Sequence, residues 1–143
     1  MAYALPSEAD QWIDTYQEKL NESTEYSEAG EGWGVGFNGD FIFHIQRDSS
    51  YGGEPVYLYI VVKNGSCEDA YVTDDPDGED WGFAFRGGAE SWKQLIEGDL
   101  DPMEGMMDGT FELDGDMQKV MQYSRAAVVM TELASDIDTE YEF

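Results

Sequence analysis

The segment that most constrains the fold is residues 56–73, which read VYLYIVVKNGSCEDAYVT. A run of seven apolar residues leads to Asn64-Gly65, and a second run suited to a strand follows it. An Asn-Gly pair between two such runs is a strong hairpin signal, because both residues readily adopt positive φ. We therefore predict paired strands over 56–63 and 67–73. The first is apolar on both faces, which indicates a central strand covered on both sides.

Apolar periodicity predicts the other elements of the first half. Helical spacing over residues 8–20 predicts an amphipathic helix that begins after Ser7. The period then changes to two, which predicts a strand over 41–46. A short strand over 33–37 is expected to join it through a tight turn at Asn38-Gly39.

A further strand is expected in WGFAFR, residues 81–86. Its alternation places Trp81, Phe83 and Phe85 on one face and two small residues, Gly82 and Ala84, on the other. Large aromatics opposite small residues indicate that another part of the chain packs closely against the small face.

Two short helices are expected next. Helical spacing predicts the first over residues 88–98, with Gly98 as its C-terminal stop. After an Asp-Pro pair, Met103, Met106 and Met107 are spaced for a single helical turn.

A short strand with Phe111 and Leu113 inward and one long helix complete the prediction. Asp114 or Asp116 caps that helix, which runs to about Leu133. The fold class is therefore α+β, a mainly antiparallel sheet flanked by helices, in one domain of 143 residues. The inward stripe of the long helix comprises Met117, Val120, Met121, Ser124, Ala127 and Val128.

The charge of the chain limits its partners and its setting. Seven Lys and Arg against 32 Asp and Glu give a formal net charge of −25, which repels nucleic acid and anionic lipid. The carboxylates are spread along the whole chain, as in proteins that work in molar salt, where the screening length is only about 3 Å. The chain lacks a signal peptide pattern, and its longest apolar run is far below the roughly 20 residues of a membrane span. We expect a halophile's cytoplasmic protein without stable membrane insertion.

No residue pattern predicts catalysis or a metal site. The acidic loops around Gly78, Gly109 and Gly115 lack the ligand spacing of a calcium-binding EF-hand. His44 is the sole histidine, which excludes a two-histidine metal site, and nothing marks a nucleophile beside it. Cys67 is the sole cysteine, and its acidic neighbours should raise the pKa of its thiol. We expect no enzymatic activity, no metal and no cofactor.

A surplus of large, adaptable apolar side chains remains, centred on the three methionines of residues 103–107. Methionine is flexible and fills irregular spaces. Core packing explains any one of these residues taken alone. Together, three methionines on a short exposed turn would make a poor rigid core but a good mouth for an apolar cavity.

The second half of the chain resembles the SCP2 sterol-carrier family. The resemblance rests on DWGFAF, on SWKQLIEGDLDPMEGMMDG and on FELDGDMQKVMQYSRAAV, and less specifically on PVYLYIVVKNG. It covers roughly residues 36–130. The positions that match the family pattern in order are Leu95, Ile96, Gly98, Pro102, Met106, Met107, Gly109, Phe111, Leu113, Gly115 and Asp116.

The resemblance implies a five-stranded antiparallel sheet and a tunnel that binds sterols, fatty acids or acyl-CoA without catalysis. The high negative charge argues against an acyl-CoA headgroup site, which needs cations. Few cations are expected near the cavity: Arg86, Lys93, Lys119 and Arg125. An alternative is an accessory subunit that docks on an enzyme of lipid metabolism. The expected ligand-binding residues are Phe43, Leu58, Phe83, Phe85, Trp92, Met103, Met106, Met107, Phe111 and Met121.

We predict that the fold requires salt, because a charge of −25 cannot be screened at low ionic strength. The melting temperature should rise steadily as KCl is increased from about 0.1 M to about 3 M. A neutral osmolyte serves as the control for general burial of apolar surface. A melting temperature that does not change with KCl would contradict the halophile interpretation.

Overall fold

The hairpin forms one edge of the larger sheet in the computed structural model, which describes residues 2–143. β3 (Val56–Lys63) and β4 (Ser66–Thr73) pair antiparallel, and Asn64 and Gly65 have φ values of 51° and 80°. The strand order is β4-β3-β2-β5-β6, so β3 lies next to the edge strand rather than at the centre. The predicted hairpin is confirmed, and its first strand is an interior strand with a partner on each side, although it is not the middle strand of the five.

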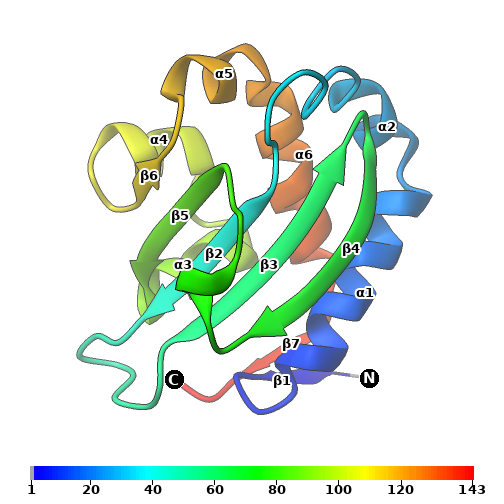
Figure 1. Ribbon diagram of the computed structural model, residues 1–143. Coiled ribbons are helices and arrows are strands. Elements are labelled where there is room, and N and C mark those ends of the chain that lie inside the picture. Colours follow the sequence, from blue (N-terminus) through cyan, green and yellow to red (C-terminus); the bar gives the residue numbers. More distant parts are fainter. Residues whose placement is uncertain (1) are drawn as a thin grey trace.

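The sheet is mixed, with a single parallel pair. β2 (Phe41–Gln46) pairs antiparallel with β3 and parallel with β5 (Phe83–Gly88), and β6 (Glu112–Asp114) pairs antiparallel with β5. The parallel pair arises because the chain leaves β4, crosses the sheet through the 3-10 turn η1 (Pro76–Gly78), and enters β5 beyond β2 (Figure 1). The α+β prediction with a mainly antiparallel sheet is confirmed.

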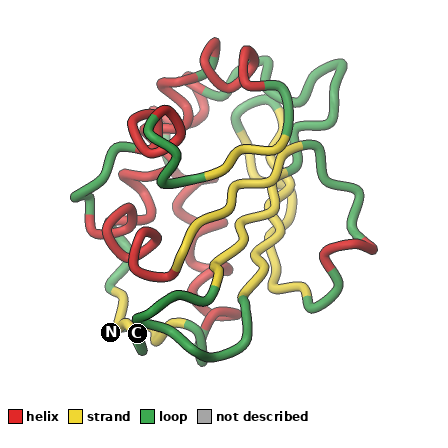
Figure 2. The backbone as a smooth tube through the Cα atoms, turned by 90° about the vertical axis from the view of Figure 1, so that its left-hand side faces the viewer, coloured by secondary structure: helices red, strands yellow, loops and turns green. Residues whose placement is uncertain are grey.

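The α-helices lie on one side of the sheet, and η1 lies on the other (Figure 2). The side with the helices holds the large core, to which every helix contributes. A parallel pair of short strands, β1 (Tyr3–Leu5) and β7 (Thr139–Tyr141), joins the two ends of the described chain. The helices are α1 (Ala9–Glu22), α2 (Thr24–Ala29), α3 (Ala89–Glu97), α4 (Pro102–Met107), α5 (Met117–Gln122) and α6 (Ser124–Ser135).

The outer face of the sheet is covered by its own aromatic side chains and by the crossing loop. Tyr59 donates hydrogen bonds to the Asp40 carboxylate at 2.8 Å and to the Asp80 carbonyl at 2.9 Å. Tyr71 donates to the Glu79 carboxylate at 2.8 Å. The second face of β3 is therefore covered without any helix, which explains why its sequence is apolar on both faces.

Residues 33–37 form turns and not the predicted strand. Gly32, Gly34 and Gly36 have φ values of 92°, 80° and 83°, and alternate residues with positive φ do not form a strand. The turns bury Trp33, whose ring stacks on Phe41 with 5.5 Å between centroids. The predicted hairpin at Asn38-Gly39 is consequently wrong as well.

Trp81 lies on the other side of the sheet from its predicted neighbours. Phe83 and Phe85 belong to the core beneath the helices, while Trp81 packs with Tyr59 on the outer face. The strict alternation fails because β5 begins only at Phe83. Gly82 lies against the backbone carbonyl of Asn38, which is the close approach that its lack of a side chain indicates.

The predicted long helix is two helices that meet at Tyr123. α5 is capped by the Asp116 carboxylate, which accepts from the Gln118 N–H at 3.0 Å, and α6 begins at Ser124. The break changes the helical phase, so the predicted inward stripe is wrong in part. Met117 and Met121 are exposed, while Val120 is buried.

We predict that Gly65→Ala destabilises the protein more than Gly36→Ala does. Both glycines have φ near 80°, but a Cβ at Gly65 would collide with the Ser27 carbonyl, whereas a Cβ at Gly36 meets open space. The losses in unfolding free energy should be about 2–5 kcal/mol for Gly65 and about 1–2 kcal/mol for Gly36. Urea denaturation in high salt measures both, and equal losses would contradict the collision.

Candidate functional site

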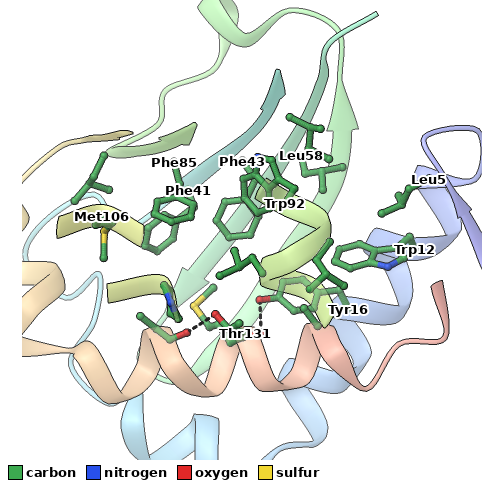
Figure 3. A pocket seen from close by; sticks show the side chains of 18 of the residues that line it. Leu5, Trp12, Tyr16, Phe41, Phe43, Leu58, Phe85, Trp92, Met106 and Thr131 are labelled. Atoms are coloured by element: carbon green, nitrogen blue, oxygen red, sulfur yellow. Dashed lines mark hydrogen bonds between the residues drawn. The ribbon is translucent and has the colours of Figure 1, made fainter. Parts of the chain in front are cut away.

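A cavity of about 80 Å³ lies between the sheet and the helices. The sheet supplies one wall and α6 the opposite wall, as Figure 3 shows for Phe43 and Leu58 against Thr131. α1 closes one end with Trp12 and Tyr16. The other lining residues are Leu5, Phe41, Ile45, Phe85, Trp92, Leu95, Ile96, Pro102, Met106, Leu113, Val120, Ala127, Met130 and Ala134.

The polar atoms of the wall already have hydrogen-bond partners. The Trp92 indole N–H donates to the His44 carbonyl at 2.9 Å, and the Trp12 indole N–H donates to the Thr139 hydroxyl at 2.9 Å. The hydroxyls of Tyr16 and Thr131 donate to carbonyls of α6. No buried side-chain nitrogen or oxygen in residues 2–143 lacks a partner. The cavity therefore presents a hydrocarbon surface without an uncompensated polar group.

Five of the expected ligand-binding residues line this cavity: Phe43, Leu58, Phe85, Trp92 and Met106. β2, β3 and β5 place the first three on the face of the sheet toward the helices, because alternate residues of a strand point to the same side. α3 and α4 bring Trp92 and Met106 over them.

The other five expected residues lie outside the lining. The ring of Phe111 stacks on that of Phe85 with 4.6 Å between centroids. The ring of Phe83 packs against that of Trp33 with 4.9 Å between centroids. Met103 is half-buried against the core. Met107 and Met121 are 77% and 52% exposed, and their side chains lie on the surface. Met103 and Met106 lie three residues apart on α4 and both pack against the core, but only Met106 reaches the cavity.

The residues that sequence reasoning missed come mainly from the two ends of the chain. Trp12 and Tyr16 belong to the helix predicted over residues 8–20, but the sequence does not mark them as part of a site. Met130, Thr131 and Ala134 follow Ala127 at helical spacing, and this spacing is the signal by which the sequence could have identified them.

A second cavity of about 30 Å³ lies beside the first. Phe41, Val120, Ala127 and Met130 line both cavities and so form the partition between them. Its remaining walls come from Tyr26, Trp33, Tyr123 and Ala126.

The four cations expected near the cavity lie outside its lining. Arg86 pairs with Glu112 at 3.6 Å and with Asp114 at 3.5 Å. Arg125 pairs with Glu25 at 3.4 Å. The ammonium groups of Lys93 and Lys119 lie over the rings of Tyr141 and Phe37, at 5.4 Å and 4.3 Å. The cavity wall thus offers no positive charge to an anionic ligand.

The side chains of the sole histidine and the sole cysteine do not belong to the lining. His44 packs on Tyr57 with 4.4 Å between ring centroids, and its partial burial lowers its pKa, as does nearby Arg86. Cys67 is buried, and burial raises the pKa of its thiol to about 12. Within residues 2–143, no three His, Cys, Asp or Glu side chains are grouped to hold a metal ion. None of the helices in that range combines the length and hydrophobicity that a membrane span requires.

Comparison with solved structures places this architecture among sterol carrier proteins. The crystal structure of a sterol carrier protein 2 is 26% identical, with a TM-score of 0.78 over 90% of this chain and 96% of that one. A conserved hypothetical protein from Thermus thermophilus, possibly a sterol carrier protein, is also 26% identical, with a TM-score of 0.77 over 91% and 88%. The apo sterol carrier protein 2 of Yarrowia lipolytica, 16% identical with a TM-score of 0.55 over 86% and 88%, shares the fold.

The family model for SCP-2 sterol transfer matches residues 38–128. No curated protein matches the chain. The matched residues contain the whole five-stranded sheet together with α3, α4 and α5, which carry most of the cavity wall. The chain therefore belongs to the SCP-2 sterol transfer family.

Proposed function

We propose that this protein binds an apolar lipid in the cavity between sheet and helices, and that it does so without catalysing a reaction on it. Membership of the SCP-2 family supports lipid binding or transfer. The observation that carries the proposal is the hydrocarbon wall, in which each polar group already has its hydrogen bond. Such a wall attracts an isoprenoid, sterol-like or acyl chain by the hydrophobic effect alone.

The cavity must widen to accept a lipid. Ligand pockets commonly measure roughly 300–1,000 Å³, and this cavity has about 80 Å³. The second cavity of about 30 Å³ supplies a route for widening, because Met130 stands in the partition between the two. Methionine has three rotatable bonds and adapts its shape readily. Movement of Met130 would join the two cavities into one internal tunnel.

We also propose that the protein works in the cytoplasm of a halophile. The net charge of −25 suits a halophile's cytoplasm, where salt screens the repulsion between carboxylates. The chain would act there as a single lipid-binding domain that excludes nucleic acid and does not insert stably in a membrane.

Native mass spectrometry of protein purified in high salt separates this proposal from the accessory-subunit alternative. Bound lipid supports the carrier, and a co-purifying enzyme of lipid metabolism supports the subunit.

We predict that Met106→Asp abolishes binding of the uncharged apolar probe diphenylhexatriene, whereas Met107→Asp binds it within about twofold of the unmodified protein. The two changes are identical in chemistry and adjacent in sequence. Only the first places a carboxylate in the cavity, since Met107 is on the surface. Fluorescence titration in high salt measures both. Equal binding by the two variants would place the probe elsewhere.

We also predict that Ala127→Leu weakens diphenylhexatriene binding by about tenfold or more without lowering the melting temperature. Ala127 lines both cavities from α6, so a larger apolar side chain would fill the void that the probe needs. This variant separates loss of the site from loss of the fold. Unchanged affinity together with an unchanged melting curve would contradict the proposed site.

A further inference from the structure

Two segments without carboxylates meet at one end of the molecule. The turns of residues 32–39 and helix α5 contain no Asp or Glu, in a chain that has 32 acidic residues. The two segments pack together: the ring of Tyr123, which follows α5, lies 5.3 Å from that of Trp33, and the Lys119 ammonium lies 4.3 Å from the ring centroid of Phe37. Figure 1 shows α5 at the top of the molecule, while both termini lie at the bottom. We call the surface formed by residues 32–39 and α5 the acid-free end.

Apolar side chains are exposed on the acid-free end. The exposed residues of α5 are Met117, Gln118, Met121 and Gln122. None of these four side chains is charged. Val35, in the glycine turns, is 54% exposed. Three of the four large apolar side chains exposed in residues 2–143 therefore lie on this end, and the fourth is Met107 of α4. Exposed apolar groups on one surface with polar residues around them indicate a contact with another molecule.

The inner side of the acid-free end faces the two cavities. Val120, on the inner side of α5, lines both of them, and Trp33 and Tyr123 line the second. A molecule that covers this end is therefore separated from the void by one helix and one layer of turns. A partner that itself holds apolar molecules would deliver them directly to the cavity from there.

The charges around the acid-free end fit a lipid surface better than a second copy of the chain. Exposed acids border it, with Glu31 before the glycine turns and Asp116 at the start of α5. A symmetric contact between two copies would bring these acids close to the same acids of the other copy. A bilayer without net charge does not repel them, and its headgroup layer admits apolar side chains. Because the contacting surface itself has no carboxylate, docking does not require one to lose its water.

We propose that the acid-free end docks reversibly on lipid bilayers without net charge, with Val35, Met117 and Met121 in the headgroup layer. The inference rests on the proposed function, because the bilayer would be the source of the lipid that the cavity binds. Three apolar side chains bury far less surface than a membrane span or a lipid anchor, so the contact is peripheral. The net charge of −25 permits this contact in high salt, where repulsion extends over only about 3 Å.

A fluorescent label on α5 tests the docking directly. Cys67 is buried and its thiol pKa is raised to about 12, so a cysteine introduced on the surface reacts selectively. Met121→Cys carries the polarity-sensitive label nitrobenzoxadiazole, and Met107→Cys carries the same label as the control. Phosphatidylcholine vesicles in about 2 M KCl should shift the emission of the α5 label to shorter wavelength and leave the control label unchanged. The same shift at both positions would overturn the proposed location.

Neutral substitutions measure the apolar contribution to docking. The double variant Met117→Gln/Met121→Gln should bind the vesicles about tenfold more weakly in co-sedimentation, because two apolar side chains no longer enter the headgroup layer. Met107→Gln is the matched control and should bind within about twofold of the unmodified protein. Met107 is 77% exposed, so a general salting-out of apolar surface would affect this control at least as strongly. Equal losses in the two proteins would therefore contradict docking through α5.

Binding of diphenylhexatriene without vesicles separates this inference from the proposed function. Met117 and Met121 line neither of the two cavities, so their double variant should bind the probe as the unmodified protein does. If the protein binds the probe but the α5 label does not respond to vesicles, the docking fails and the lipid cavity stands. If the folded protein docks on vesicles but binds no probe, the proposed function fails and the docking surface stands.

Sedimentation velocity without vesicles tests the competing occupant. The unmodified protein should sediment as a monomer in about 2 M KCl. A dimer that Met117→Gln/Met121→Gln dissociates would assign the acid-free end to a second copy of the chain and overturn the inference.

Discussion

The interaction on which the site depends is the attachment of Trp92 to the sheet. Its indole N–H donates to the backbone carbonyl of His44 at 2.9 Å, which fixes α3 across β2. Its ring also contacts Phe43, Phe85 and Phe111 at centroid distances of 5.4, 5.6 and 5.1 Å. Rings have few rotatable bonds, so this cluster holds one wall of the cavity in a single shape.

The opposite wall, on α6 and α4, is made of small or flexible side chains. α6 presents Ala127, Met130, Thr131 and Ala134, which are small or flexible, and α4 adds Met106. Small side chains leave room, and methionine changes rotamer to fit what enters. The structure therefore combines a stiff aromatic wall, made by the sheet and by Trp92 of α3, with an adaptable wall made by α6 and α4. Widening for a ligand would come from the adaptable side.

The parts that could be predicted from sequence are those governed by local pattern. Asn64-Gly65 specified its hairpin, and the alternation of β2 and β5 placed Phe43 and Phe85 on the side toward the helices. The break at Tyr123 could not be predicted, because no proline or glycine marks it. Its ring packs edge-on against Trp33 at 5.3 Å, a contact between residues ninety positions apart. Such a tertiary contact overrides the local tendency of the chain to continue one helix. The direction in which α6 then faces determines which of its side chains reach the cavity.

The pairing of the two ends of the chain could not be predicted from the sequence either. β1 and β7 pair from opposite ends of the chain, and this pairing brings Leu5 to the cavity wall. A strand of three residues carries too little periodicity to be recognised from sequence. The predicted cavity mouth at the methionine turn was therefore only part of the wall, because α1 and the N-terminal strand close the other part.

The methionines and carboxylates of residues 101–116 divide between inside and outside. Met106 lines the cavity, while the acids of this segment, Asp101, Glu104, Asp108, Glu112, Asp114 and Asp116, are exposed. The charge therefore forms an outer layer, separated from the void by aromatic and aliphatic side chains. Salt acts on that outer layer by screening its self-repulsion, and so it acts on the stability of the compact state. A neutral ligand in the void does not interact with the layer, whereas an anionic one would meet its full repulsion. A charged surface of this kind is thus compatible with lipid binding as long as the bound molecule carries no charge.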